Sequence, residues 1–127
     1  MCNGFATRLA SSALVLALLA PLALAQSVRL VVQSSPLAGF RYHAAQELWG
    51  ELGVGDALTL ERERDNPHDA NAVSVAWRGH KLGYVPRREN ALLAWSLDRG
   101  ERLRARISRL RPHPNPARRL EFEVYIE

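Results

Sequence analysis

The feature that most constrains this chain is one stretch, Arg62 to Arg87, that holds a polar turn and two short strands. Its sequence is RERDNPHDANAVSVAWRGHKLGYVPR. Pro67 fixes its own φ angle and keeps the preceding residue out of the helical region, so residues 65–71 are predicted as a turn. Residues 73–77 alternate between large apolar and small side chains, as in a half-buried strand, and residues 82–85 supply the partner strand. The stretch therefore predicts a β-hairpin entered through a polar turn.

Alternating patterns elsewhere predict four more strands, which cover residues 28–32, 57–62, 102–107 and 121–126. Helical spacing predicts two short helices, at 43–49 and 91–97. Residues 34–39 are predicted as a loop. Six strands and two helices in about 100 residues favour a mainly β fold, a small and partly open barrel. Its core is expected to contain the inward aliphatic side chains and the three tryptophans, Trp49, Trp77 and Trp95.

The first 25 residues have the pattern of a secretory signal peptide. Arg8 precedes an apolar run at 9–24, and small residues form an A-x-A pattern that ends at Ala25. The alternative is an uncleaved membrane anchor, which Pro21 and the small residues disfavour. We therefore expect export to the periplasm or the outside of the cell, cleavage after Ala25 and no stable membrane span in the mature protein.

The mature protein would be a single domain, residues 26–127, without cysteine, because Cys2 leaves with the signal peptide. Without Arg8, one of the 17 basic residues, it carries a net charge of +3, too small to identify a polyanion partner. Arginine is concentrated near the C-terminus, where three side chains alternate on one face of a strand: Arg102, Arg104 and Arg106. If the last two strands pair, Glu121 and Glu123 share that face and neutralise it.

The order R-E-x-x-N-P-x-D-x-N-A-V, followed by L-G-Y-V-P-R, is a long pattern of uncommon residues at fixed offsets. Together with the upstream run Gly39-Phe40-Arg41-Tyr42-His43, it resembles the HIRAN domain, a small β-rich module found alone in bacteria and fused to helicases in eukaryotes. The resemblance covers about residues 28–126. It implies an OB-like barrel that binds single-stranded nucleic acid or a free 3′ end.

The resemblance also implies the site, which comprises Arg41, Tyr42, His68, Asp69, Tyr84 and Arg87. The Tyr42 ring would stack on a terminal base while Arg41 neutralises its phosphate; the alternative is that Tyr42 caps the core and Arg41 is solvated. Arg87, after Pro86 at an expected helix start, would contact phosphate, and the alternative is an ordinary solvated helix entry.

Asp69 would accept a hydrogen bond from a terminal ribose hydroxyl, with the ring of His68 stacking on the base. Helicase-linked relatives have tyrosine where this chain has His68, and the exchange weakens stacking and makes it sensitive to pH. The alternative is structural, because an aspartate inside a turn also braces the backbone.

Enzymatic interpretations have less support. A metal-dependent phosphodiesterase around His68 and Asp69, with Asp65 and His80, lacks a recognised ligand spacing or a nucleophile paired with a base. No glycine loop for nucleotide phosphates is present. We therefore expect no catalysis and no metal or nucleotide cofactor. Because an exported domain does not meet replication forks, the main alternative is an envelope protein whose barrel binds a protein or small ligand.

Overall fold

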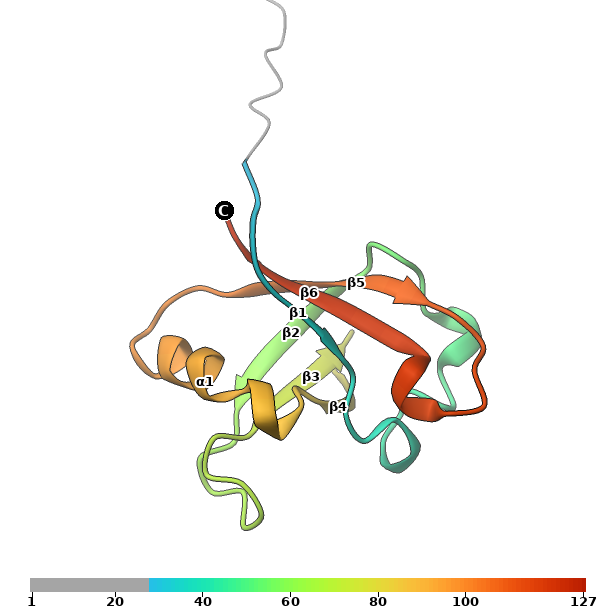
Figure 1. The fold of residues 1–127 in the computed structure, drawn as a ribbon, viewed down its shortest axis with the longest axis horizontal. Helices are drawn as coiled ribbons and strands as arrows, with labels where there is room; N and C mark the ends of the chain where they lie inside the picture. The colour runs from blue at the N-terminus through green and yellow to red at the C-terminus, as the bar shows by residue number, and fades with distance from the viewer. Residues whose placement is uncertain (1–27) are drawn as a thin grey trace, which may run out of the picture.

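The computed structural model describes residues 28–127, so the predicted signal peptide and its cleavage site lie outside the described residues. Six antiparallel strands form a sheet in the order β1-β6-β5-β2-β3-β4 (Figure 1). The strands are β1 (Leu30–Pro36), β2 (Ala57–Arg62), β3 (Val73–Trp77), β4 (His80–Tyr84), β5 (Arg104–Leu110) and β6 (Leu120–Ile126). The helical segments are α1 (Ala91–Asp98) and the 3₁₀ turns η1 (Phe40–Tyr42), η2 (Trp49–Glu51), η3 (Arg87–Glu89) and η4 (Pro116–Arg118). Over residues 28–127, no helix is long and apolar enough to cross a membrane.

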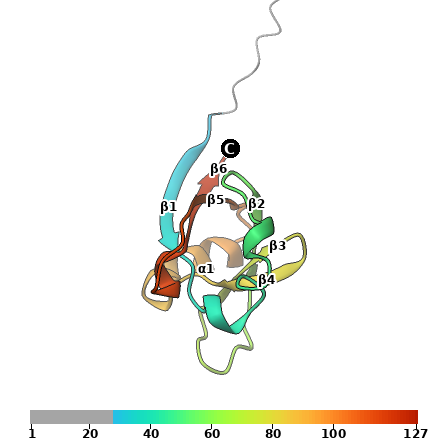
Figure 2. The same cartoon turned by 90° about the vertical axis from the view of Figure 1, so that its right-hand side faces the viewer.

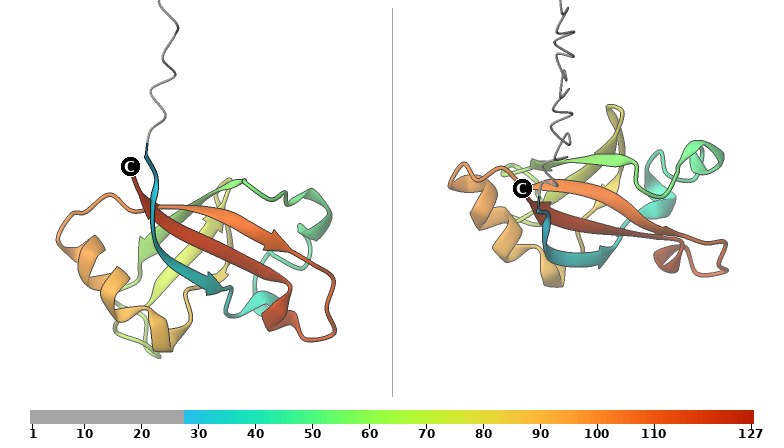
Figure 3. Two further views of the ribbon diagram at one scale, coloured as in Figure 1. Left: turned by 45° about the horizontal axis from the view of Figure 1, so that its top comes forward. Right: turned by 90° about the horizontal axis from the view of Figure 1, so that it is seen from above.

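The sheet curls into a barrel that stays partly open, as Figures 2 and 3 show from three further directions. Its edge strands are β1 and β4, and a single antiparallel bridge joins the chain just after β1 to β4, between Ala38 and Tyr84. Each backbone N–H of this pair donates to the other carbonyl at 2.9 Å. Gly83 permits the approach, since a Cβ there would lie 2.2 Å from the Ala38 carbonyl oxygen. The predicted fold class, a partly open barrel, is confirmed.

The predicted hairpin forms between β3 and β4. Val73, Val75 and Trp77 are all buried, as their alternation indicates. Arg78 and Gly79 both have positive φ angles, 47° and 82°, which is the conformation of a type I′ turn and matches the twist of the flanking strands. The guanidinium of Arg78 lies over the Trp77 ring, 4.5 Å from its centroid.

The core lies inside the curled sheet and is mainly aliphatic. Its most buried members include Leu37, Leu82, Ile107, Phe122 and Val124, and each large side chain removed from water stabilises the fold by about 1.5–3 kcal/mol. The expectation that all three tryptophans are in the core is wrong. Trp77 is buried and Trp49 packs against the core from its edge, but Trp95 is 57% exposed because α1 turns Leu93 and Ala94 inward instead.

Two local predictions are also wrong. Residues 43–48 form a bend and turns rather than a helix, and Trp49 begins η2. His43 is extended, the backbone N–H of Ala44 anchors the segment to the Lys81 carbonyl of β4, and within residues 43–49 the Leu48 N–H alone donates to a carbonyl four residues back. The first strand runs to Pro36, through part of the predicted loop, and the side chains of Leu30 and Val32 are exposed. A bulge in the pairing with β6, between Val31 and Gln33, shifts the alternation along the strand.

Candidate nucleic-acid interface

One groove gathers five of the six residues expected in the site: Tyr42, His68, Asp69, Tyr84 and Arg87. Its volume is about 620 Å³, and Ala38, His43, Asn66, Ala72 and Val85 complete the lining. We call it the Tyr42 groove. Its walls come from η1, the turn at 65–71, β4 and the start of η3, and η1 and the turn both lie at the lower end of the molecule in Figures 1 and 2. Arg41 does not line the groove; it lies on η1 and is exposed to solvent.

The turn at 65–71 is held by its own side chains. The backbone N–H of His68 donates to Oδ1 of Asn66 at 2.9 Å. Asp69 uses both carboxylate oxygens: Oδ1 accepts from the backbone N–H of Asn71 at 2.9 Å, and Oδ2 accepts from Nδ2 of Asn90 at 2.7 Å. Asn90 is 2% exposed, so Asp69 ties the turn to the start of α1. The bracing role is therefore present, and because a carboxylate offers about four acceptor positions, a ligand hydroxyl can still bind.

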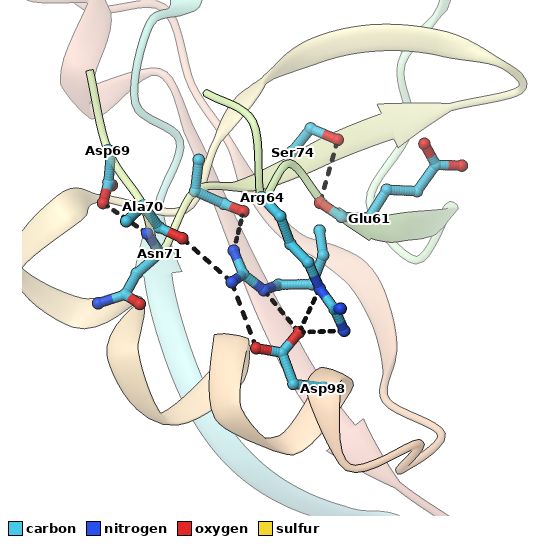
Figure 4. A network of polar contacts seen from close by, with 9 residues as sticks. Glu61, Arg64, Asp69, Ala70, Asn71, Ser74 and Asp98 are labelled. Carbon is cyan, nitrogen blue, oxygen red and sulfur yellow. Dashed lines mark hydrogen bonds and ion pairs between the residues drawn. The ribbon is translucent and has the colours of Figure 1, made fainter. Parts of the chain in front are cut away.

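A second tie reaches the same turn from the end of β2. The guanidinium of Arg62 donates to the carbonyl oxygens of Ala72 and Ala70, at 2.9 and 3.1 Å, and to both oxygens of Asp98 at the end of α1. Arg64 also pairs with Asp98, and Figure 4 shows these two labelled side chains joined by dashed lines. Hydrogen bonds from Arg62, together with both positive charges, lower the pKa of Asp98. The strand, the turn and the helix are thus joined at one guanidinium, that of Arg62.

Tyr84 is fixed by a polar cluster behind the groove. Its hydroxyl donates to Oε1 of Glu63 at 2.8 Å, and Nζ of Lys81 donates to the other carboxylate oxygen at 2.6 Å. Partial burial would raise the pKa of Glu63, but hydrogen bonds from Lys81, Tyr84 and Asn66 outweigh burial, so the pKa is lowered. The bond to Glu63 raises the pKa of Lys81. The cluster keeps the Tyr84 ring at the groove wall.

The η1 side of the groove is more open. Tyr42 is 83% exposed, so the alternative that it caps the core is wrong. The adjacent His43 ring meets the Tyr84 ring edge-on, with centroids 5.4 Å apart. Burial and the nearby Lys81 charge lower the pKa of His43, so this ring is neutral at pH 7. Exposed and partly exposed aromatic rings therefore line the groove from two sides.

Arg87, the first residue of η3, lines the groove. The segment after Pro86 is a three-residue 3₁₀ turn rather than the start of the helix, and α1 begins at Ala91. Arg87 is exposed, and no carboxylate within residues 28–127 forms an ion pair with it. Its charge is thus available to an anionic ligand at the groove entrance.

The arginine stripe on β5 is different. Arg106 pairs with Glu123 at 3.1 Å, as predicted from the pairing of the last two strands, and Arg104 pairs with Glu127 at 3.4 Å. Glu121 lies opposite Arg109 in the register instead. In the part of the chain that the structure describes, no three His, Cys, Asp or Glu side chains are grouped as a metal site would require.

The residues that support the groove were mostly not predicted from the sequence. Glu63 lies inside the motif but was assigned no role, and His43 was only part of the upstream pattern. The contacts of Arg62 and Lys81 depend on partners 36 and 18 residues away, respectively. In the sequence, the fixed order of the motif residues was the only signal that could have indicated a role for these supporting residues.

A partly open antiparallel barrel with an aromatic and cationic groove beside its closing bridge is an OB-like binding domain. The HIRAN domain model matches residues 30–127, and the chain belongs to the HIRAN family, a family of nucleic-acid-binding domains. A crystal structure of a Lactobacillus plantarum protein is 31% identical, with a TM-score of 0.67, over 77% of this chain and 94% of that one. The HIRAN domain of human HLTF shares the fold at 18% identity and a TM-score of 0.53, over 79% of this chain and 80% of that one. Comparison with curated proteins gave no match.

Proposed function

We propose that this domain binds single-stranded nucleic acid at a free 3′ end, in the Tyr42 groove. The observation that supports it is the gathering, in one groove of about 620 Å³, of aromatic rings, a carboxylate and an arginine without an acidic partner in residues 28–127. Stacking on aromatic rings and phosphate pairing are the two interactions by which single strands are bound without sequence preference.

Each group has a distinct role in this proposal. Tyr42, exposed at the rim, stacks on a base, and His68 supplies a second ring. Arg87 at the entrance and Arg41 on η1 neutralise phosphates. Asp69 accepts a hydrogen bond from a 3′ hydroxyl and repels a 3′ phosphate by like charge. The domain carries out no reaction; it holds a strand end.

The phosphate role is tested by fluorescence anisotropy with labelled oligonucleotides at several salt concentrations. Arg87→Ala should weaken binding to every single strand and reduce the salt slope by about 0.7, the value for one phosphate contact on a single strand. Arg102→Ala is the matched control, since Arg102 is exposed, lacks an acidic partner within residues 28–127 and lies before β5, beside a different pocket. Equal slopes for the wild type and Arg87→Ala would remove Arg87 from the site.

The end preference is tested with strands that carry a 3′ hydroxyl or a 3′ phosphate. Asp69→Asn keeps the size of the side chain and an oxygen for the Asn71 N–H, but loses the negative charge and the acceptor for Nδ2 of Asn90, so a melting curve must first show that the variant is folded. The preference for the hydroxyl end should fall, whereas Asp65→Asn, an exposed change in the same turn, should leave it intact. No measurable binding by wild-type protein at low salt would contradict the whole proposal.

The N-terminal sequence supports a further proposal, that the domain acts outside the cytoplasm after cleavage behind Ala25. Mass spectrometry of protein from its host should then find Gln26 at the N-terminus. An intact Met1 in a cytoplasmic fraction would contradict export and favour an intracellular ligand. In an exported domain, the nucleic acid would be extracellular or incoming.

One observation favours a second candidate, an envelope protein that binds a small ligand or a protein. The Tyr42 groove has the volume of a small-molecule site, which spans about 300–1,000 Å³. The same anisotropy experiment separates the candidates, because the second predicts no oligonucleotide binding at any salt concentration.

A further inference from the structure

A second groove, of about 450 Å³, lies between η1, η2 and the loop that joins β5 to β6. We call it the Trp49 groove. η1 contributes to both grooves, since Phe40 lines the Trp49 groove and Tyr42 lines the first. η4 packs against η1, and Figure 1 shows the two segments side by side near the β6 end of the molecule. The two grooves are thus neighbours across a single 3₁₀ turn.

The Trp49 groove presents an aromatic surface beside a positioned guanidinium. The rings of Phe40 and Trp49 meet edge-on, with centroids 5.7 Å apart and planes at 71°. The guanidinium of Arg119 lies 5.3 Å from the Phe40 ring, and its Nε donates to the His113 carbonyl at 2.7 Å. Within residues 28–127 the terminal nitrogens of Arg119 form no hydrogen bond or ion pair. They are therefore available to an acceptor in the groove.

The arginines around this groove form no ion pair within residues 28–127. Arg111, Arg118 and Arg119 surround the loop, and none has a carboxylate partner in residues 28–127. Arg104 and Arg106, on the same strand as the start of the loop, do have such partners. Arg41, on the intervening η1, is also exposed and without an acidic partner in that range. The cations that the fold leaves unpaired here extend from one groove to the other.

We propose that the Trp49 groove is a second nucleotide subsite for the strand whose end lies in the Tyr42 groove. The inference rests on the proposed function. Trp49 stacks on a base, Arg119 pairs with a phosphate, and Arg41 neutralises the phosphate between the grooves. An OB-type fold contacts about 4–16 nucleotides of a single strand, so a strand held at its end continues across the surface. An acidic peptide matches the charge but supplies no planar ring for the Trp49 face.

The test compares 3-nucleotide and 12-nucleotide oligothymidylates with free 3′ ends. Wild-type protein should bind the longer strand more tightly, and Trp49→Ala should weaken that binding by about 5- to 100-fold, the effect of losing one stacked base. Arg119→Gln should lower the salt slope for the longer strand by about 0.7. Both variants should bind the 3-nucleotide strand as the wild type does. Arg102→Gln is the matched control.

Fluorescence gives a readout that does not depend on the alanine variant folding. The indole of Trp49 should be quenched by the 12-nucleotide strand but not by the 3-nucleotide strand, and Trp49→Phe, which keeps a ring against Phe40, should abolish the difference. Equal affinities for the two strands, or no effect of Arg119→Gln, would overturn the subsite. If 3-nucleotide binding still depended on Arg87, the proposed function would stand alone; if neither strand bound, both proposals would fail. Equal quenching by oligoglutamate would also overturn the subsite, in favour of an acidic peptide site.

Discussion

The two walls of the Tyr42 groove are built in different ways. The wall formed by the turn and Tyr84 is held by Arg62, Asn90 and Glu63, which tie it to α1 and β2. The η1 wall has one exposed ring, Tyr42, and none of the side-chain hydrogen bonds among residues 28–127 involves Arg41 or Tyr42. The turn and Tyr84 wall is thus shaped by residues that stabilise the fold, whereas the η1 wall presents side chains that are free to contact solvent or a ligand.

This difference separates stability from binding. A substitution behind the braced wall should lower the free energy of unfolding and, through the shape of the groove, the affinity as well. A substitution of an exposed η1 side chain, Arg41 or Tyr42, should change affinity alone. Measuring the free energy of unfolding and the affinity for the same variant therefore distinguishes residues that stabilise the fold from residues that contact a ligand.

The largest effect, on the free energy of unfolding, is expected in the core strand β3. Val75 is fully buried between β2 and β4. Val75→Asp places an unpaired carboxylate in the core, at a cost of several kcal/mol, which approaches the whole stability of a small domain. The variant should be unfolded by circular dichroism and lose both walls together. Thr59→Asp, at an exposed position of neighbouring β2, is the control. A Val75→Asp variant that melts like the wild type would show that Val75 does not lie on the inward face of β3.

The next effect concerns the braced wall alone. Arg62→Ala removes hydrogen bonds to two backbone carbonyls and to Asp98, and leaves the Ala72 carbonyl without this partner. The free energy of unfolding should fall by about 2 kcal/mol, because hydrogen bonds from a charged group are involved. Arg64→Ala also removes a guanidinium from Asp98 but has no backbone contact, so it should cost less than about 0.5 kcal/mol. Urea unfolding of the two variants measures the difference, and equal losses would contradict the role of the backbone contacts.

The elements that sequence analysis placed well are those whose pattern is local. β2 has the predicted bounds, and the alternation of Leu58 and Leu60 with exposed residues gives the inward face. The prediction failed where a distant strand decides the backbone. The pairing of β1 with β6 introduces the bulge near Val31, and a hydrogen bond from the Ala44 N–H to the Lys81 carbonyl anchors the segment after η1 to β4. The spacing of apolar residues within each segment does not reveal these distant partners, β6 and Lys81.

The candidate site divides in the same way. Five of the six residues that the resemblance implied for the site line the groove, because the resemblance fixes their order along the chain. Their supports were not predicted, since the Arg62–Asp98 and Asp69–Asn90 contacts join residues 36 and 21 positions apart. The double role of Asp69 illustrates the limit: its turn predicts bracing, but only the fold shows that Asn90 takes the second oxygen.

A smaller effect is expected at Glu63, and it depends on pH. Because its pKa is lowered in the folded state, Glu63 contributes stability above the unfolded pKa of about 4.3, and this contribution is lost as pH falls through the folded value. Glu63→Gln should therefore cost about 1 kcal/mol at pH 6 and less at pH 3. Glu61→Gln, at an exposed position of β2 two residues earlier, is the control. Urea unfolding at the two pH values measures both, and a cost that does not shrink in acid would contradict the role of the Glu63 charge.

The smallest effect on stability, and the sharpest separation, is expected at Tyr42. Its ring is 83% exposed, so Tyr42→Ala removes little buried surface and should change the free energy of unfolding by less than about 0.5 kcal/mol. If the ring stacks on a base, the same variant should lose about 1–3 kcal/mol of binding energy to a single strand. Tyr42→Phe keeps the ring and should bind nearly as the wild type does. The salt slope should be the same for all three proteins, since the ring carries no charge and releases no counterion. Urea unfolding and anisotropy on the same samples test both expectations. If the alanine and phenylalanine variants bind alike, Tyr42 does not stack on a base. If the alanine variant loses as much stability as Arg62→Ala, the two walls of the groove do not differ in their contribution to stability.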